Sequence, residues 1–242
     1  MYIVRCKIGD FNIEFETDIR TYEKSMRDYI YDFDLANIVV KISDSDIKFE
    51  KDIYDETVPP KYSSVFKRSA LFRVLAEQLP ERKAFDLHSA TFDVDGTGVA
   101  FAAISGTGKT THMNRWQSYL GEKMTVVNGD KPIVRFFDSE PQQPYAYGTP
   151  WMGKECYGCN MRTPLKHICF IERSDYNFVE SIDKNSAVKR IMNQIYMPRD
   201  PAAVMKTIQF ADRLLSCCNL WVIHCNMDDN AGEIAYKAIF EN

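Results

Sequence analysis

The sequence predicts an α/β protein with a strand-rich amino-terminal annex over residues 1–62, a core over residues 63–242 and a helical last third. Three patterns lead to this prediction: alternating apolar residues near the amino terminus, short apolar runs mixed with helical spacing in the middle, and apolar stripes at helical spacing toward the carboxyl terminus. The chain has 242 residues, of which 45% are hydrophobic. It is therefore long enough to bury a full core without disulfides.

The annex is expected to begin with a β-hairpin. Apolar residues alternate on both sides of Gly9–Asp10, two residues that favour a tight turn. A second pair of strands is expected at 38–42 and 47–53. After Pro59–Pro60, apolar spacing predicts a helix over 63–78, which Pro80 closes.

The rest of the chain alternates between strand and helix signals. The small, apolar run 99–104 suits a buried central strand, and the helix over 110–120 has Gly121 just past its end as a C-cap. The last third contains three apolar stripes at helical spacing. The remaining expected strands are 87–94, with a turn at Asp95–Gly96 after it, 124–128, 133–137, 167–172 and 220–225.

Charge and cysteine content exclude several classes of protein. Thirty Lys and Arg against 34 Asp and Glu give a net charge of −4, which argues against nucleic acid as a partner. No apolar run approaches the roughly 18 to 20 residues that cross a bilayer, and residues 1–5 lack a signal-peptide core. Seven cysteines, an odd number, suit a reducing compartment. We therefore expect a cytoplasmic protein that binds neither nucleic acid nor membrane.

One stretch between a buried strand and an amphipathic helix has the composition of a phosphate-binding P-loop. Its glycines let backbone N–H groups turn toward phosphate oxygens, and the start of the next helix adds a positive dipole end. We expect Lys109 to contact the β- and γ-phosphates of a nucleotide, and the Thr110 hydroxyl to bind Mg²⁺. Ala103 stands where such loops usually have their first glycine. The stretch consists of Ser105, Gly106, Thr107, Gly108, Lys109, Thr110 and Thr111.

A P-loop also needs a carboxylate at the end of a neighbouring strand to hold the metal. Asp130 follows the expected strand 124–128 and would lie beside Thr110 at the carboxyl edge of the sheet. It is the candidate metal ligand and general base. Taken alone, Gly129-Asp130-Lys131-Pro132 is also a typical β-turn.

Together these motifs resemble a known family. The P-loop followed by Gly129–Asp130 is similar to the kinase motifs of ATP-dependent phosphoenolpyruvate carboxykinase, and the order from His88 to Asp130 resembles the catalytic domain of HPr kinase/phosphorylase. The resemblance implies a P-loop core with a mixed sheet, ATP and Mg²⁺ as cofactors, and a peptide or small protein as phosphoryl acceptor. Because HPr kinase forms hexamers, it also implies a homo-oligomer.

The resemblance assigns roles to two further features. In HPr kinase a histidine before the loop assists the acid that activates the acceptor hydroxyl, and His88 stands at the matching place. The family has two adjacent acids after the loop, whereas here Asp130 lies between Gly129 and Lys131. One carboxylate would therefore serve where the family has two.

Other basic residues are candidates for neutralising charge on the transferred phosphoryl group. The segment from Tyr147 to Glu155 could place Lys154 over the phosphates, or it could be a surface loop anchored by Trp151. Arg162 and Lys166 precede a strand, as a basic segment does in HPr kinase, although solvated surface cations are the alternative interpretation.

The predicted function is an ATP- and Mg²⁺-dependent kinase of the HPr kinase type that phosphorylates a hydroxyl, with serine as the expected acceptor. Two alternatives remain: a nucleotide-binding regulatory module without turnover, and a carboxykinase-like lyase, for which the chain is short. The annex could bind the acceptor or cover the core.

Overall fold

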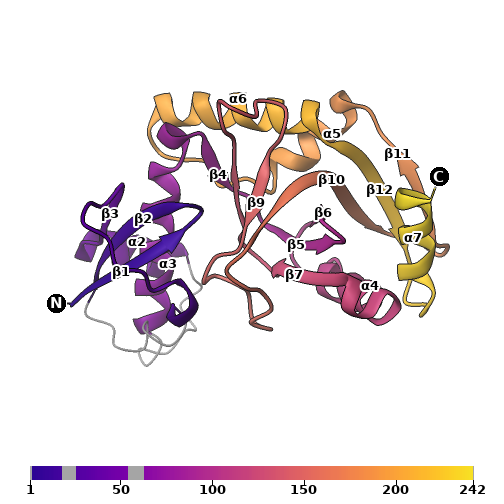
Figure 1. Ribbon diagram of the computed structural model, residues 1–242, viewed down its shortest axis with the longest axis horizontal. Helices are drawn as coiled ribbons and strands as arrows, with labels where there is room; N and C mark the ends of the chain where they lie inside the picture. The colour runs from indigo at the N-terminus through magenta and orange to yellow at the C-terminus, as the bar shows by residue number, and fades with distance from the viewer. Residues whose placement is uncertain (1, 18–25, 54–62, 242) are drawn as a thin grey trace.

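The computed structural model describes residues 2–17, 26–53 and 63–241. These residues form a three-stranded sheet, a nine-stranded sheet and six α-helices, which confirms the predicted α/β class (Figure 1). The strands are β1 (Tyr2–Ile8), β2 (Phe11–Thr17), β3 (Ile38–Lys41), β4 (Ala84–Asp86), β5 (Ser89–Val94), β6 (Thr97–Ala102), β7 (Met124–Asn128), β8 (Ile133–Arg135), β9 (Tyr145–Tyr147), β10 (Arg162–Arg173), β11 (Phe178–Ser181) and β12 (Asn219–Cys225). The helices are α2 (Asp44–Ile53), α3 (Ser63–Gln78), α4 (Lys109–Leu120), α5 (Lys184–Met192), α6 (Pro201–Cys217) and α7 (Ala231–Phe240), with short 3₁₀ turns at Arg27–Tyr29, Pro80–Arg82 and Gly121–Lys123.

The annex begins with the predicted hairpin. β1 and β2 pair antiparallel up to Ile8 and Phe11, and the two turn residues, Gly9 and Asp10, have φ values of +63° and +60°. Positive φ at both central positions is typical of the turns that match strand twist. β3 adds to β2 in parallel, and the inward side chains of the three strands are buried.

The predicted strand at 47–53 is wrong, because these residues lie in helix α2. The Ser43 hydroxyl accepts from the backbone N–H of Asp46 at 3.3 Å, and the Asp46 carboxylate accepts from the backbone N–H of Ser43 at 2.9 Å. This reciprocal pair is a capping box that starts a helix. The capping signal outweighs the local β-branched composition.

Helix α3 has the predicted bounds and packs against the annex sheet. Leu71, Leu75 and Leu79 are fully buried in the same cluster as the inner residues of β1–β3. The predicted boundary at residue 62 lies outside the described residues. The annex and the first core helix therefore share one hydrophobic cluster.

The strand order of the large sheet brings the carboxyl ends of β6 and β7 to the same edge. Its main path runs β4-β8-β9-β10-β6-β5-β7, and β12 pairs with β10. β6, β10 and β12 are parallel, while β5 runs antiparallel to β6 and β7. The sheet is thus mixed, and β7 runs in the same direction as β6. Their carboxyl ends therefore meet at one edge.

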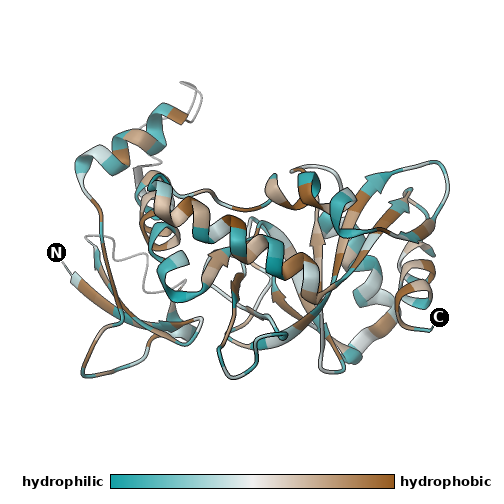
Figure 2. Ribbon diagram, turned by 90° about the horizontal axis from the view of Figure 1, so that it is seen from above, coloured by the Kyte–Doolittle hydropathy of each residue, from teal (hydrophilic) through white to brown (hydrophobic). Residues whose placement is uncertain are grey.

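The C-terminal helices follow the predicted pattern and cover the large sheet. Asp200 caps α6 by accepting from the backbone N–H of Ala203 at 2.8 Å, and Pro201 is its first residue. Figure 2 shows hydrophobic and hydrophilic bands along this helix, whose apolar face packs against β10 and β12 residues. No described helix is long and apolar enough to span a lipid bilayer.

Candidate functional site

The glycine-rich loop connects β6 to α4 at the centre of the large sheet. β6 ends at Ala102, and α4 begins at Lys109 with Gly108 as its N-cap. Gly106 and Gly108 have φ values of +80° and +120°, a region that side chains disfavour. The two glycines therefore permit the turn that places Lys109 at the head of the helix.

The strand order brings Asp130 and His88 to the same place. Asp130 follows β7, and His88 precedes β5, which lies between β6 and β7. Because β5 is antiparallel to both neighbours, its first residues lie at the carboxyl ends of β6 and β7. The backbone N–H of Ser89 donates to the carbonyl of Asp130 at 3.0 Å, which ties the two segments together.

Three predicted site residues form a continuous contact. Lys109 Nζ lies 3.3 Å from His88 Nε2, and His88 Nε2 lies 3.2 Å from Asp130 Oδ1. Lys109 Nζ also donates to the carbonyl of Ala103 at 2.7 Å. A neutral imidazole nitrogen either donates or accepts. His88 Nε2 therefore accepts a hydrogen bond from Lys109 or donates one to Asp130, but does not do both at once.

Burial and nearby charges shift the pKa values of Lys109 and Asp130. Burial lowers the pKa of Lys109, and the charge of Asp130 opposes that shift only in part. Burial alone would raise the pKa of Asp130, but the hydrogen bond with His88 and the nearby Lys131 and Lys109 charges outweigh it and lower that pKa. Asp130 is therefore an ionised carboxylate at neutral pH.

The segment from Gly148 to Cys159 supports Asp130 from the annex side. A Cβ at Gly148 would lie 1.9 Å from the carbonyl oxygen of Cys159, so only glycine fits there. The backbone N–H of Gly129 donates to Tyr157 at 2.8 Å, and a Cβ at Gly153 would lie 3.2 Å from Asp130 Cβ. The segment therefore packs directly on the acid.

Trp151 anchors the same segment to α3. It is 5% exposed, packs against Phe72 with ring centroids 5.0 Å apart, and donates from Nε1 to the carbonyl of Arg68 at 3.4 Å. Lys154 is exposed at the tip of the segment. The loop is anchored by Trp151, as one of the two interpretations expects, and it lies next to Asp130. The role of Lys154 over the phosphates stays a prediction.

The structure does not bring Arg162 into this group. Arg162 begins β10, which is parallel to β6, so it lies at the opposite sheet edge from the glycine-rich loop. Its guanidinium contacts Asp10 at 3.3 Å and the Tyr147 hydroxyl at 3.2 Å, and it lies over the Tyr145 ring. These contacts join β10 and β9 to the annex hairpin.

A cation that the sequence reasoning missed stands at the other end of the same strand. Arg173 ends β10 and donates from Nη2 to the carbonyl of Gly106 at 2.7 Å. No sequence motif pointed to Arg173, because its place beside the loop follows from the parallel pairing of β10 with β6. Arg173 is thus the arginine that this structure places next to the glycine-rich loop.

The donor set fits a magnesium ion bound together with phosphate. Among residues 2–17, 26–53 and 63–241 there is no group of three His, Cys, Asp or Glu suited to a metal. Mg²⁺ is commonly held by one or two protein oxygens plus water and substrate phosphates. The ionised carboxylate of Asp130 and the hydroxyl of Thr110, in the first turn of α4, are of that kind.

A second acid is buried close by. Asp86 ends β4, is 3% exposed, and its Oδ1 has no hydrogen-bond partner among the described residues. Burial raises its pKa to about 7, a shift that Lys131 opposes and Asp130 reinforces. The sequence reasoning did not single out this residue, because its burial depends on the pairing of β4 with β8.

We expect Asp86→Asn to remove a pH dependence of stability. The folded state keeps the Asp86 proton up to a pH of about 7, whereas the unfolded state releases it near 3.8, so stability falls as pH rises through that window. The full effect is about 4 kcal/mol. Urea unfolding at pH 5 to 8.5 should show an advantage of the variant over wild type that grows up to about pH 7 and then stays constant. Parallel curves for the two proteins, as expected for the surface control Asp212→Asn, would contradict this.

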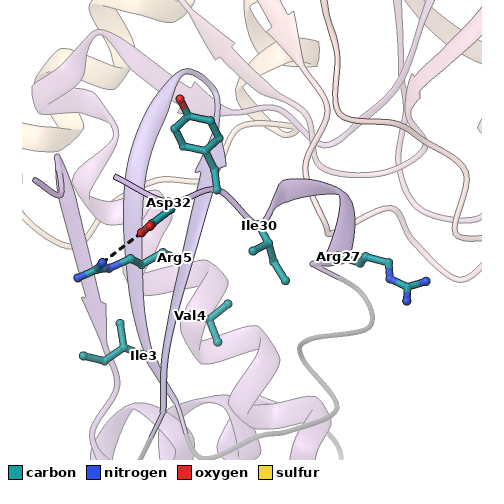
Figure 3. A pocket seen from close by; sticks show the side chains of 7 residues that line it. Ile3, Val4, Arg5, Arg27, Ile30 and Asp32 are labelled. Atoms are coloured by element: carbon teal, nitrogen blue, oxygen red, sulfur yellow. Dashed lines mark hydrogen bonds and ion pairs between the residues drawn. The ribbon is translucent and has the colours of Figure 1, made fainter. Parts of the chain in front are cut away.

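The annex carries an open hollow of its own. It measures about 730 Å³ and lies between β1 and the segment 27–32, with Ile3, Val4 and Ile30 on its apolar side (Figure 3). Arg5 contacts Asp32 at 3.3 Å beside it. Its lining residues all belong to the annex, so it is separate from the Lys109 group.

Comparison with known proteins found similar solved structures but no sequence match. No known protein family and no curated protein matches the sequence. Among solved structures, the HPr(Ser) kinase/phosphatase from Coxiella burnetii is similar with a TM-score of 0.36 and 8% identity, over 65% of this chain and 99% of that chain.

Proposed function

We propose that this protein is an ATP- and Mg²⁺-dependent phosphotransferase that phosphorylates a hydroxyl group, with serine in a peptide or small protein as the acceptor. The observation that carries the proposal is the contact of one histidine with both the loop lysine and an ionised acid. At the head of α4, His88 Nε2 lies 3.3 Å from Lys109 Nζ and 3.2 Å from Asp130 Oδ1. A cation for phosphates and a base for a hydroxyl are the two groups that this transfer needs.

Each residue has a defined part in the reaction. The loop N–H groups and Lys109 bind the β- and γ-phosphates, and Thr110 and Asp130 would hold Mg²⁺, which neutralises phosphate charge when bound. The acceptor oxygen forms a bond to the γ-phosphorus while the bond to the β-γ bridging oxygen breaks and ADP leaves. Asp130 accepts the hydroxyl proton. When Lys109 turns to phosphate, His88 Nε2 is free to donate to Asp130 and hold its orientation.

The direct test is transfer of labelled γ-phosphate from MgATP to serine-containing peptides by the full chain. We expect slow but measurable phosphoserine formation together with ATP binding at millimolar or lower concentration. Absence of both binding and transfer would remove the proposal. Binding without hydrolysis or transfer in single-turnover experiments would instead identify a regulatory nucleotide-binding module.

A further inference from the structure

A buried hydrogen-bond network joins the turn that carries Asp130 to the segment that Trp151 anchors. Its centre is the contact of Asn128, the last residue of β7, with Thr149, and both side chains are fully buried. Asn128 Nδ2 donates to the carbonyl of Thr149 at 3.0 Å and to its hydroxyl Oγ1 at 3.0 Å. The two residues are 21 positions apart in the sequence, so the contact links two separate parts of the chain.

The remaining polar atoms of both side chains hold the backbone of the turn. Asn128 Oδ1 accepts from the backbone N–H groups of Asp130 and Lys131 at 2.9 and 2.7 Å. Thr149 Oγ1 donates to the carbonyl of Lys131 at 2.7 Å and accepts from the backbone N–H of Trp151 at 3.3 Å. The Asn128 amide therefore uses both of its donors and both of its acceptor lone pairs. The reverse amide orientation would set its NH₂ group against two N–H donors.

A fully satisfied buried network restrains the backbone that it contacts, because the loss of one member leaves another buried polar group without a partner. Two backbone hydrogen bonds restrain the same turn. The N–H of Gly129 donates to the carbonyl of Tyr157 at 2.8 Å, and the carbonyl of Asp130 accepts from Ser89 at 3.0 Å. The distance of 3.2 Å between His88 and Asp130 thus depends on hydrogen bonds made by the backbone on either side of the acid.

We propose that Asn128 and Thr149 are positioning residues for phosphoryl transfer, which together hold the turn so that the Asp130 carboxylate faces His88 and the acceptor hydroxyl. The inference rests on the proposed function and adds the residues that orient its base. Both side chains are fully buried, so neither contacts a ligand. Their effect therefore falls on the rate of transfer, since a displacement of about 1 Å at a reacting group can lower a rate about 100-fold.

The test removes the Thr149 hydroxyl from the full chain. Thr149→Val does so at nearly constant volume, Thr149→Ala is the second variant and leaves no new methyl group beside polar atoms, and Thr149→Ser keeps the hydroxyl. The matched control is Thr207→Val in α6, because the Thr207 hydroxyl is equally buried and donates to the carbonyl of Ala203 at 2.8 Å.

The first measurement is transfer of labelled phosphate from MgATP to a serine-containing peptide. We expect kcat to fall by about 10- to 100-fold in Thr149→Val and Thr149→Ala, with the KM for MgATP unchanged, because the phosphate-binding loop is not altered. Thr149→Ser should recover most of the wild-type kcat, and Thr207→Val should keep it. A general loss of folded protein would lower the activity of the control as well.

The second measurement is amide hydrogen exchange by NMR without nucleotide, which does not depend on activity. The amides of Asp130 and Lys131 should exchange about tenfold faster in Thr149→Val than in wild type, as expected for the loss of one buried hydrogen bond. In Thr207→Val both amides should exchange at the wild-type rate.

The outcomes separate this inference from the proposed function. Wild-type kcat in Thr149→Val and Thr149→Ala overturns the inference, and so does a Thr149→Ser variant as slow as Thr149→Val. Wild-type exchange of the two amides in both variants that lack the hydroxyl also overturns it. If the wild-type protein neither binds MgATP nor transfers phosphate, the proposed function is removed, and the exchange measurement alone then decides whether Thr149 holds the turn at Asp130.

Discussion

Asp130→Asn is expected to lower the rate of phosphoryl transfer by about 10³-fold, within the range typical of a lost general base. Asparagine keeps the size of the side chain but does not accept the hydroxyl proton. The backbone at this position should stay in place, because the Asn128 side chain accepts from the N–H groups of Asp130 and Lys131 at 2.9 and 2.7 Å. ATP affinity should change by a few-fold only. Single-turnover transfer and equilibrium binding measured on the same preparation provide the comparison.

The matched control is Asp212→Asn. Asp212 pairs with Lys184 at 2.6 Å on the surface of α5 and α6, and exposed pairs contribute little to stability. This variant should transfer phosphate at the wild-type rate. If Asp130→Asn retained more than a tenth of the wild-type rate, another group would have to accept the proton, and the assignment of Asp130 as the base would be wrong.

Lys109→Met is expected to weaken MgATP binding by about 100-fold and to abolish measurable transfer. The ammonium group supplies charge-assisted hydrogen bonds to phosphate, each contributing about 1.5 to 3 kcal/mol. Methionine fills similar space without the charge. Isothermal titration with MgATP and with tripolyphosphate should show the same loss for both ligands, because the lysine contacts phosphate and not the base.

Stability measurements distinguish this loss from unfolding. Burial lowers the pKa of Lys109, so the charge is already disfavoured in the folded protein without a ligand. The variant should therefore unfold at or above the wild-type temperature when no nucleotide is present. Lys123→Met, at the exposed end of the turn after α4, is the control and should bind as wild type. Wild-type MgATP affinity in Lys109→Met would overturn the role given to the loop.

Local sequence signals predicted those elements whose determinants lie within a few residues. The Gly9–Asp10 hairpin, helix α3, strand β7 and the end of α4 at Gly121 have the expected places. Strand β9, with only three residues, carries too little periodicity to be recognised. β10 starts before the predicted residue 167 because Arg162–Pro164 pairs with β9, and a proline in the sequence argues against a strand there.

The residues of the candidate site also fall into two groups, those that local motifs suggest and those that only the tertiary structure reveals. Lys109 and Asp130 were suggested by short motifs, and the structure places both against His88; their catalytic roles stay predictions. Asp86 and Arg173 were not found from the sequence. Their importance depends on which strands pair, and this property comes from tertiary packing. The same topology explains why Arg162, at the start of β10, lies away from the loop.

The contacts of Trp151 with α3 have a consequence for work on shortened proteins. A version starting at residue 63 would keep every residue of the glycine-rich loop, and Phe72 on α3 as well. It would nevertheless uncover the apolar cluster that α3 shares with β1–β3 and remove the contact of Phe15 with the tryptophan. The segment that packs Gly153 against Asp130 would then be held less firmly. A shortened protein that binds nucleotide but transfers phosphate poorly would reflect the missing support, so kinetic comparisons should use the full 242-residue chain.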